Sequence, residues 1–183
     1  MRSLEDFLFK VPLGIRSRFV NSTYRMLGMK TGNQNRFEKG RIRRAKQISI
    51  GNNNNFSNGY QLWPLDEEHN NLRIKIGNEN YFNRNVMIDA CGYIEIGNEN
   101  QFGPDIYITD SNHTYGNDIS PKDHEMQRGT VKIGNYCWIG AKVVILKDVE
   151  LGDFCVVAAG AVVTKSFPKG SVIGGVPARI IKQ

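Results

Sequence analysis

Histidine is the residue type in this chain best suited to moving a proton near neutral pH, and the sequence has three, His69, His113 and His124. His113 directly follows Asp110, Ser111 and Asn112, at a point where a regular pattern of apolar residues stops. An imidazole there could take the proton of a hydroxyl group as its oxygen attacks a carbonyl carbon. A lone histidine is more often a solvated loop residue, so residue type alone leaves both interpretations open.

The cysteines do not point to nucleophilic or metal chemistry. Cys91, Cys137 and Cys155 are odd in number, which does not fit a disulfide framework, and their spacing is not that of zinc ligands. Their positions suggest no Cys–His nucleophile pair. We interpret them as reduced thiols of a cytoplasmic protein.

An internal repeat defines the elements that must position these residues. Residues 50–54 (IGNNN), 76–80 (IGNEN) and 96–100 (IGNEN) are nearly the same, and residues 133–135 (IGN) begin a fourth copy. Apolar residues recur at every sixth position, with interruptions, at Ile76, Phe82, Ile88, Ile94, Ile96, Phe102, Ile108, Ile133, Ile139, Ile145, Leu151, Val157 and Val163. A second row comprises Val131, Val143, Val149, Cys155 and Ala161.

A six-residue period fits neither an α-helix nor an ordinary alternating strand. It predicts coils of three short strands, each strand followed by a turn, with one apolar side chain per strand pointing into a triangular prism. Small or turn-forming residues such as Gly77, Gly97 and Gly134 follow the apolar residue and suit the corners. Each coil buries its interior only by stacking on its neighbours.

The repeat divides the chain into a body and two ends. The β-helix is expected over residues 47–168, with insertions near 57–73 and 113–130. Residues 1–46 form a basic, partly helical segment, in which Leu4, Phe7, Leu8 and Val11 precede Pro12 at helical spacing. Ile15, Phe19 and Met26 are expected to form a second amphipathic face that ends at Gly28. Residues 169–183 form a basic C-terminal tail.

Three stretches resemble the hexapeptide-repeat acetyltransferases: residues 133–141 (IGNYCWIGA), 158–165 (AAGAVVTK) and 175–179 (GVPAR). The resemblance is to the galactoside, maltose and polysaccharide O-acetyltransferases of that family, and it covers roughly residues 74–183. It implies an all-β fold, a left-handed parallel β-helix. General rules of chain connection would favour the right hand, so the handedness comes from the resemblance alone.

The resemblance also implies the chemistry. An acetyl group would pass from acetyl-CoA, the co-substrate, to a hydroxyl of a sugar or glycan precursor, with His113 as general base, no acyl-enzyme and no metal. The backbone groups of Ala141 and Ala159 would meet the pantetheine amides, and the N–H of Ala141 could stabilise the oxyanion. The tail would pack near the CoA site, where the nucleotide phosphates would meet Thr164, Lys165, Arg179 and Lys182.

For the acceptor, Asn83 lies at the position where the galactoside enzymes have a substrate-contacting asparagine, and an amide can both donate to and accept from sugar hydroxyls. Asn85 and Tyr81 are further candidates. Trp138 precedes the inward-facing Ile139 and should point outward, toward the acceptor, the pantetheine or a neighbouring subunit. A turn-corner role for the asparagines is equally open.

Other functions remain possible on the same repeat. An amine of an amino sugar or foreign compound could replace the hydroxyl. A γ-type carbonic anhydrase would need three convergent imidazoles, and His69 and His124 lie in the insertions. A non-catalytic scaffold is disfavoured by His113 and the CoA-type C-terminus.

The charge distribution suggests where the protein works. Residues 1–46 contain twelve Lys or Arg and three acids, a net charge of +9 against +6 for the whole chain. No nucleic-acid motif accompanies this basic segment. The resemblance implies a homotrimer with active sites between subunits. We expect a cytoplasmic protein whose N-terminus either packs on the prism or also touches an anionic membrane surface at the inner face. No secretory signal or membrane span is expected.

Overall fold

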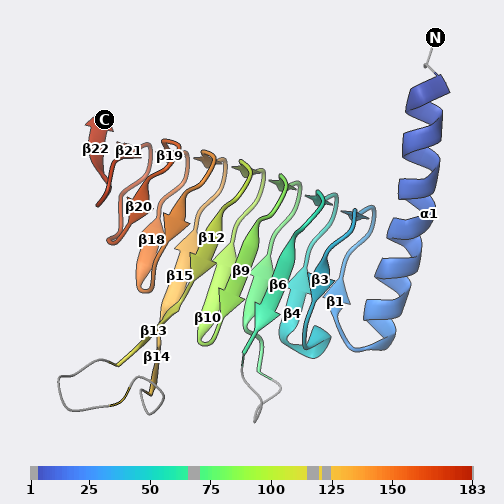
Figure 1. Cartoon of the computed structure of the whole chain (residues 1–183), viewed down its shortest axis with the longest axis horizontal. Helices are drawn as coiled ribbons and strands as arrows, with labels where there is room; N and C mark the ends of the chain where they lie inside the picture. Colours follow the sequence, from blue (N-terminus) through green and yellow to red (C-terminus); the bar gives the residue numbers. More distant parts are fainter. Residues whose placement is uncertain (1–3, 66–70, 115–119, 121–124, 183) are drawn as a thin grey trace.

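Short parallel strands wind into a three-sided prism, and one helix lies across the N-terminal end of that prism (Figure 1). The computed structural model describes residues 4–65, 71–114, 120 and 125–182, and side chains are described from residue 12 onward. The two ends of the chain lie at opposite ends of the prism's long axis. The predicted all-β, left-handed parallel β-helix is confirmed.

Each side of the prism is one sheet, called here face A, B or C. Face A contains β1 (Lys30–Thr31), β4 (Ile48–Ile50), β7 (Ile74–Ile76), β10 (Tyr93–Ile96), β15 (Thr130–Ile133) and β18 (Val149–Leu151). Face B contains β2 (Arg36–Phe37), β5 (Asn55–Phe56), β8 (Tyr81–Phe82), β11 (Gln101–Phe102), β16 (Trp138–Ile139), β19 (Val156–Val157), β21 (Val172–Gly174) and β22 (Arg179–Lys182). Face C contains β3 (Arg41–Ile42), β6 (Gln61–Pro64), β9 (Met87–Ala90), β12 (Tyr107–Thr109), β17 (Val144–Ile145) and β20 (Val162–Val163).

The interior is the predicted apolar ladder. Both sequence rows are buried throughout, with exposed fractions of 0–2% from Ile76 to Val163. Along face B the interior is aromatic in the first coils: the rings of Phe37, Phe56, Phe82 and Phe102 stack in order, with centroids 4.6–4.9 Å apart. Stacking therefore repeats at the spacing of neighbouring strands.

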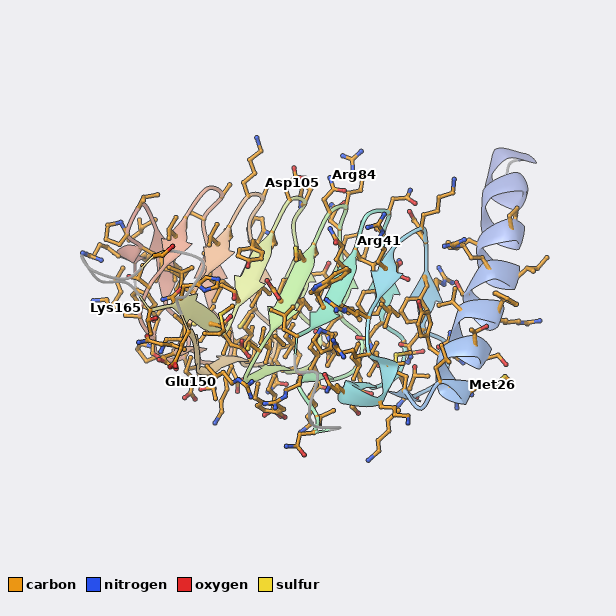
Figure 2. All side chains as sticks on the ribbon, turned by 60° about the horizontal axis from the view of Figure 1, so that its bottom comes forward. Met26, Arg41, Arg84, Asp105, Glu150 and Lys165 are labelled. Atoms are coloured by element: carbon orange, nitrogen blue, oxygen red, sulfur yellow. The ribbon has the colours of Figure 1, made fainter. Side chains whose placement is uncertain are left out.

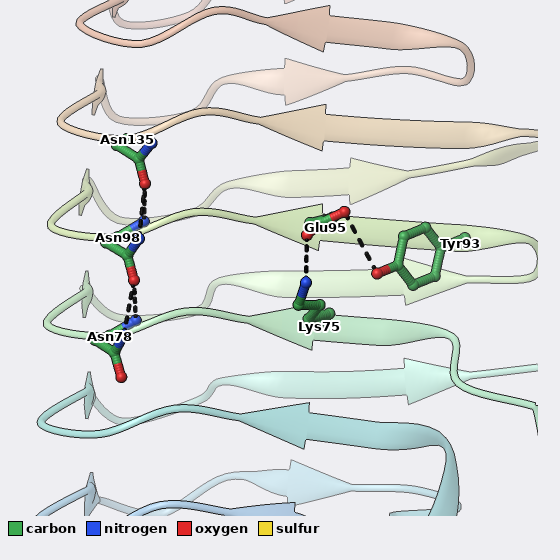
Figure 3. Close-up of polar contacts among 6 residues, drawn as sticks. All are labelled: Lys75, Asn78, Tyr93, Glu95, Asn98 and Asn135. Carbon is green, nitrogen blue, oxygen red and sulfur yellow. Dashed lines mark hydrogen bonds and ion pairs between the residues drawn. The ribbon is translucent and has the colours of Figure 1, made fainter.

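The corner between faces A and B carries two asparagine ladders. In the inner ladder, the buried Asn80 accepts through Oδ1 from the backbone N–H of Asn100 at 2.9 Å, and its Nδ2 donates to the carbonyl of Gly97 at 2.9 Å. The outer ladder runs in the opposite sense, because Asn78 donates its backbone N–H to Oδ1 of Asn98, and Asn98 donates to Asn135, both at 2.8 Å (Figure 3). Side chains thus fix the vertical register of the coils.

The same corner explains the glycine and the left-handed residue of the IGNxN repeat. A Cβ on Gly97 would lie 2.6 Å from the carbonyl oxygen of Gly134 in the next coil, which is too close for any side chain. Two residues later the backbone has a positive φ, as at Glu99, where φ is 57°. Corner residues with this conformation recur at Asn53, Glu79, Glu99, Tyr136 and Phe154.

The N-terminal segment is a single helix, α1 (Leu4–Met26), which continues through Pro12. The helix ends at Met26, and Gly28, the residue predicted to close it, follows with a φ of 92°. Its packed side presents polar groups to the first coil. Ser17 Oγ accepts from the N–H of Phe37 at 2.9 Å, and Asn21 Nδ2 donates to the carbonyl of Asn35 at 2.9 Å. Within the described residues, no helix has the length and apolar character that a bilayer span requires.

The prism begins earlier than residue 47 and its first excursion is shorter than residues 57–73. The first coil already uses β1, β2 and β3, and it leads into the 3-10 helix η1 (Ala45–Gln47). Residues 57–64 remain on the prism, because β6 pairs with β9. The second excursion leaves after β12 as an antiparallel hairpin of β13 (Ser111–His113) and β14 (Met126–Arg128), which projects from the edge between faces C and A (Figure 1).

The C-terminal segment closes the opposite end. β22 pairs antiparallel with β21 at the edge of face B. The turn before it bonds to the last strand of face C, since Val162 donates its N–H to Gly175 at 3.0 Å and accepts from Ala178 at 2.8 Å. Residues 175–182 therefore pack on the last coil.

Candidate functional site

His113 lies at the outer end of the hairpin stem. It is exposed and pairs in register with Met126. Beyond it, Thr114 donates its backbone N–H to the carbonyl of Glu125 at 2.8 Å, and Glu125 returns its N–H to Thr114 Oγ1 at 3.0 Å. The imidazole is therefore carried on a hydrogen-bonded stem rather than on an unpaired loop.

Asp110 anchors that stem to the prism. Its side chain is fully buried and accepts from the backbone N–H groups of Cys91 at 2.7 Å and Gly92 at 2.9 Å. Its own carbonyl accepts from the N–H of Gly129, where the hairpin returns, at 2.8 Å. Burial raises the pKa of the Asp110 carboxyl, and the two N–H donors oppose that rise. Asp110 holds three segments together, a role that the sequence did not reveal.

Cys91 lies beside this anchor, and its environment does not favour a thiolate. Burial raises the pKa of the Cys91 thiol above its ordinary value, while the nearby Arg128 and Arg73 act in the opposite direction. Burial also raises the pKa of Cys137 to about 12, and Cys155 shifts in the same direction. A neutral buried thiol is a poor nucleophile, which agrees with the interpretation of the cysteines as structural.

A second acidic group, Asp89, lies on the outer side of face C and was not singled out from the sequence. Tyr107 donates its hydroxyl to Asp89 Oδ2 at 2.9 Å, and burial raises the pKa of the Asp89 carboxyl. The other oxygen, Oδ1, is buried and has no hydrogen-bond partner within the described part of the chain. In the strand ladder Asp89 pairs with Thr109, so it lies directly before the stem that carries His113.

The acceptor candidates gather on face B and at the corner between faces B and C. Tyr81 and Trp138 share one outward row, each paired in register with Gln101 between them. Trp138 is 62% exposed, which confirms that it points outward. Asn83 turns back on its own corner, since its Oδ1 accepts from the N–H of Arg84 at 2.8 Å.

Asn85 has mainly a corner role. Its φ is 59°, and its Nδ2 donates to Asp105 Oδ1 in the next coil at 2.8 Å. This contact occupies one donor of the amide, so the turn-corner interpretation of Asn85 is well supported by the geometry. Asn83 keeps its Nδ2 group for other partners, because the contact within its corner uses only the oxygen.

Ala141 and Ala159 occupy equivalent positions in successive coils at the B–C corner. Gly160 donates its N–H to the carbonyl of Ala141 at 2.8 Å, which stacks the two turns. The N–H groups of Ala141 and Ala159 donate to no backbone carbonyl in residues 71–114 or 125–182. In an earlier coil the same position is Arg84. This corner therefore has two backbone N–H groups without a backbone partner in those residues, beside small side chains.

The basic candidates lie on the last coil and the C-terminal strand. Thr164 and Lys165 follow β20 and are exposed, with Lys165 Nζ 5.6 Å from the ring centre of Phe167. Arg179 and Lys182 are exposed on β22, and Arg179 donates to the carbonyl of Ala178 at 3.0 Å. All four lie at the C-terminal end of the prism, two coils beyond the hairpin.

The candidate residues lie at the two opposite edges of face C. His113 lies at its edge with face A, whereas Asn83 and the alanine corners lie at its opposite edge, with face B. Between them, half-buried Val144, Leu146 and Val162 form an apolar outer surface. One chain therefore does not bring His113 and Asn83 together.

Metal ligation was also considered. Among the described residues, no three His, Cys, Asp or Glu side chains are grouped closely enough to hold a metal ion. His69 and His124 lie outside the described residues. The structure therefore shows no zinc-type constellation around His113 in the part of the chain that it describes.

Comparisons with known proteins agree with the fold. The family model for bacterial transferase hexapeptide (six repeats) matches residues 130–165. The chain is 36% identical over 110 residues to galactoside O-acetyltransferase of Escherichia coli (strain K12), covering 60% of this chain and 54% of that protein. It is 32% identical over 117 residues to the putative lipopolysaccharide biosynthesis O-acetyl transferase WbbJ of the same organism, covering 56% of this chain and 60% of that protein.

A solved structure supports the same architecture. The N-acyltransferase AntD from Bacillus cereus, in complex with dTDP and 3-hydroxybutyryl-CoA, superposes with a TM-score of 0.74 at 20% identity, covering 88% of this chain and 87% of that one. The chain spans little more than half the length of the curated relatives it matches. The predicted resemblance to hexapeptide-repeat acetyltransferases is confirmed.

Proposed function

We propose that this chain is an acetyl-CoA-dependent O-acetyltransferase that acts on a hydroxyl of a sugar or glycan precursor. The observation that carries the proposal is the placement of His113 on an anchored stem, at one edge of a face whose other edge presents unpaired backbone N–H groups. The named similarity to galactoside and lipopolysaccharide O-acetyltransferases supports the same acceptor class.

In this mechanism His113 acts as general base. It takes the proton of the acceptor hydroxyl while the oxygen attacks the thioester carbonyl carbon, which gives a tetrahedral intermediate. The C–S bond then breaks, the imidazolium returns its proton to the departing thiolate, and the acetyl ester and free CoA are released. Transfer is direct in this mechanism, without an acyl-enzyme, and the raised pKa of the Cys91 thiol makes that residue a poor nucleophile.

The corner and the C-terminal end suit acetyl-CoA as a substrate. Ala141 and Ala159 offer backbone donors without side chains that would block an extended pantetheine arm. The N–H of Ala141 is suited to the developing oxyanion. Thr164, Lys165, Arg179 and Lys182 supply a hydroxyl and three cations for the phosphates.

The acceptor site is completed by a second copy of the chain. Tyr81, Trp138 and Asn83 lie on face B and its corner with face C, away from the His113 of the same chain. A homotrimer with sites between subunits would bring the His113 of one subunit to the face B surface of the next. The apolar outer surface of Val144, Leu146 and Val162 on face C and the 62% exposed Trp138 are consistent with burial in such an assembly.

The test is CoA-thiol release from acetyl-CoA across sugars, nucleotide sugars and amino sugars, with His113→Ala compared with wild type. Loss of a general base lowers kcat/KM by about 100- to 10,000-fold. Gln127→Ala, an exposed position on the partner strand of the same stem, serves as the matched control and keeps near wild-type activity.

Each result has a distinct meaning. Release with amino sugars alone would move the proposal to acetylation of an amine, and the Bacillus cereus neighbour is likewise named an N-acyltransferase. Unchanged turnover in His113→Ala would remove the general-base assignment. An absence of both turnover and acetyl-CoA binding would favour a scaffold, and zinc found in the purified protein together with CO2 hydration would favour a carbonic anhydrase.

A further inference from the structure

The outer side of α1 is apolar and unpartnered. Ile15, Phe19 and Met26 are 66%, 71% and 85% exposed, at a spacing that aligns them along one side of the helix. Figure 2 shows Met26 at the end of α1 nearest the prism, pointing away from the coils. The sequence predicted these residues as an amphipathic face, and the structure shows that the side of the helix with Ser17, Val20, Asn21 and Tyr24 contacts the prism instead. We call Ile15, Phe19 and Met26 the apolar ridge.

A basic cleft of about 700 Å³ lies beside this ridge, between α1 and the A–B corner of the first two coils. Three arginines line it, Arg18 and Arg25 from the helix and Arg36 from β2. The remaining lining residues are glycine, serine, asparagine or glutamine, and none is acidic. We call this the arginine cleft. Its composition suits a ligand that carries negative charge and several hydrogen-bonding oxygens.

The polar groups of the cleft are only partly satisfied by the protein. Arg25 donates to the carbonyls of Thr31 at 2.9 Å and Gly32 at 2.7 Å, so it is held in place. Arg18 and Arg36 are exposed and form no ion pair within the described residues. The cleft thus has two arginines whose charges are not paired with an acidic side chain of the described residues.

The cleft and the ridge adjoin along the helix. Gly14, Arg18 and Ser22 line the cleft, and Ile15 and Phe19 are their immediate neighbours in sequence on the outer side. The helix lies across the N-terminal end of the prism, at the opposite end from β20 and β22 (Figure 1). A ligand with a charged group joined to an apolar chain would satisfy both.

We propose that the arginine cleft and the apolar ridge form a docking surface for anionic membrane lipid, with a phosphate head group in the cleft and the ridge in the outer acyl region. An amphipathic helix with arginines beside a bulky apolar stripe lies in the plane of an anionic bilayer surface. A second copy of α1 is a poorer occupant. Residues 12–26 contain Arg16, Arg18 and Arg25 and no acid, so two such helices would bring like charges together.

If the proposed function holds, acetyl transfer takes place beside the membrane, where a lipid-linked acceptor is within reach. Only this consequence rests on the proposed function. Binding itself requires neither acetyl-CoA nor His113. A failure of lipid binding and a failure of acetyl transfer can therefore be told apart.

The experiment is flotation of the full chain with vesicles of phosphatidylcholine alone or with one third phosphatidylglycerol. Wild type should float with the anionic vesicles only. Arg18→Gln with Arg36→Gln should weaken binding by about 30-fold, since each arginine near an anionic surface contributes roughly a fivefold factor. The matched control is Arg84→Gln with Lys132→Gln, which removes the same charge from exposed positions on later coils (Figure 2 labels Arg84).

The ridge is tested separately with Phe19→Ser, an exposed change that leaves the contacts of Ser17 and Asn21 in place. It should weaken vesicle binding about tenfold while circular dichroism stays unchanged. Equal loss in the control pair would reduce the effect to net charge and overturn the cleft. Binding of glucose 1-phosphate that needs Arg18 and Arg36, without any flotation of wild type, would assign the cleft to a soluble phosphate ester and overturn the membrane proposal.

Discussion

The coils before the hairpin and the coils after it have the same shape but different interiors. Up to Phe102, the inner A–B corner is a continuous ladder of Asn35, Asn54, Asn80 and Asn100, and the interior of face B is a stack of four phenylalanine rings. After the hairpin, the equivalent positions are Cys137 and Cys155 in the corner and Ile139 and Val157 inside. The ladder ends where Cys137 donates its N–H to Asn100 Oδ1 at 2.7 Å.

This difference shows how one architecture divides its tasks. In the first region, buried amides specify which coil stacks on which, and each must be satisfied by its neighbours. In the second, small apolar residues fill the prism and the corners carry Ala141 and Ala159, which leave backbone N–H groups available to a ligand. The family model matches residues 130–165, which belong to this second region.

The largest expected effect is loss of an inner-ladder amide. Asn80→Ala removes hydrogen bonds to Asn54, Gly97 and Asn100 inside the protein, which should lower the free energy of unfolding by about 3–5 kcal/mol. Cys137→Ala, at the equivalent corner position, loses only weak thiol contacts and should cost about 1 kcal/mol. Urea unfolding monitored by circular dichroism measures both. Equal losses would show that the two regions are held in the same way.

The second prediction concerns the open corner. Ala159→Phe places a ring over the unpaired N–H groups and should raise KM for acetyl-CoA at least about tenfold, with little change in stability, because the position is exposed. Arg84→Phe makes a comparable change at the equivalent corner of an earlier coil and should leave this KM unchanged. Steady-state kinetics against acetyl-CoA tests the pair, and an equal rise in both variants would argue against a corner reserved for the co-substrate.

At the boundary between the regions, Asp110 should give the stem a pH-dependent stability. Its pKa is raised in the folded protein, mainly by burial, so the folded state binds its proton more tightly than the unfolded state. Stability from this group is therefore complete below the ordinary carboxyl pKa and falls as pH rises through the raised one.

Asp110→Asn should flatten that decline, and the measurement is the melting temperature of both proteins from pH 3 to 8. The difference between the two curves is the relevant quantity, because other carboxyls titrate in both proteins. A wild-type advantage that grows with pH would contradict the assigned direction. The acetyl-transfer rate of Asp110→Asn, measured in the same preparation, shows whether Asp110 positions the stem that carries His113.

The smallest effect is expected on the charged surface of face A. Lys75 Nζ lies 2.7 Å from Glu95 Oε1, and this exposed pair raises the pKa of Lys75 (Figure 3). Lys75→Met should change the free energy of unfolding by less than about 1 kcal/mol, and the change should vanish in high salt. A loss comparable to that of Asn80→Ala would mean that surface pairs, rather than the inner ladder, hold the first region.

The sequence predicts the prism well because a strict period of six residues leaves few alternatives. It places Ile76 and Val163 inside and Trp138 outside, as the structure has them. The ends of the excursions were less predictable, because Gln61 to Pro64 look irregular in sequence and become a strand only through pairing with β9. The packed side of the helix was likewise not predicted, since it combines polar contacts of Ser17 and Asn21 with the partly buried Val20 and Tyr24, whereas the bulkier apolar residues face outward.

The candidate site could be predicted only in part from the sequence, for a related reason. His113 could be found by its residue type and its place at the break in the repeat. Asp89 and Tyr107 are separated by a full coil, and their contact depends on a strand register that no local sequence pattern predicts. Asp110 was visible beside His113, but only the structure shows that its side chain turns inward to Cys91 and Gly92.

The elements at the two ends of the prism cover backbone edges that would otherwise be open to pairing. A coil that accepts the next coil of its own chain presents the same edge to any other copy, so an uncovered solenoid end is a template for filament growth. At one end α1 occupies the N–H of Phe37 and the carbonyl of Asn35. At the other, the reversed strand β22 and the turn on Val162 occupy the last coil. These contacts occupy backbone groups at both ends, which disfavours end-to-end stacking of copies.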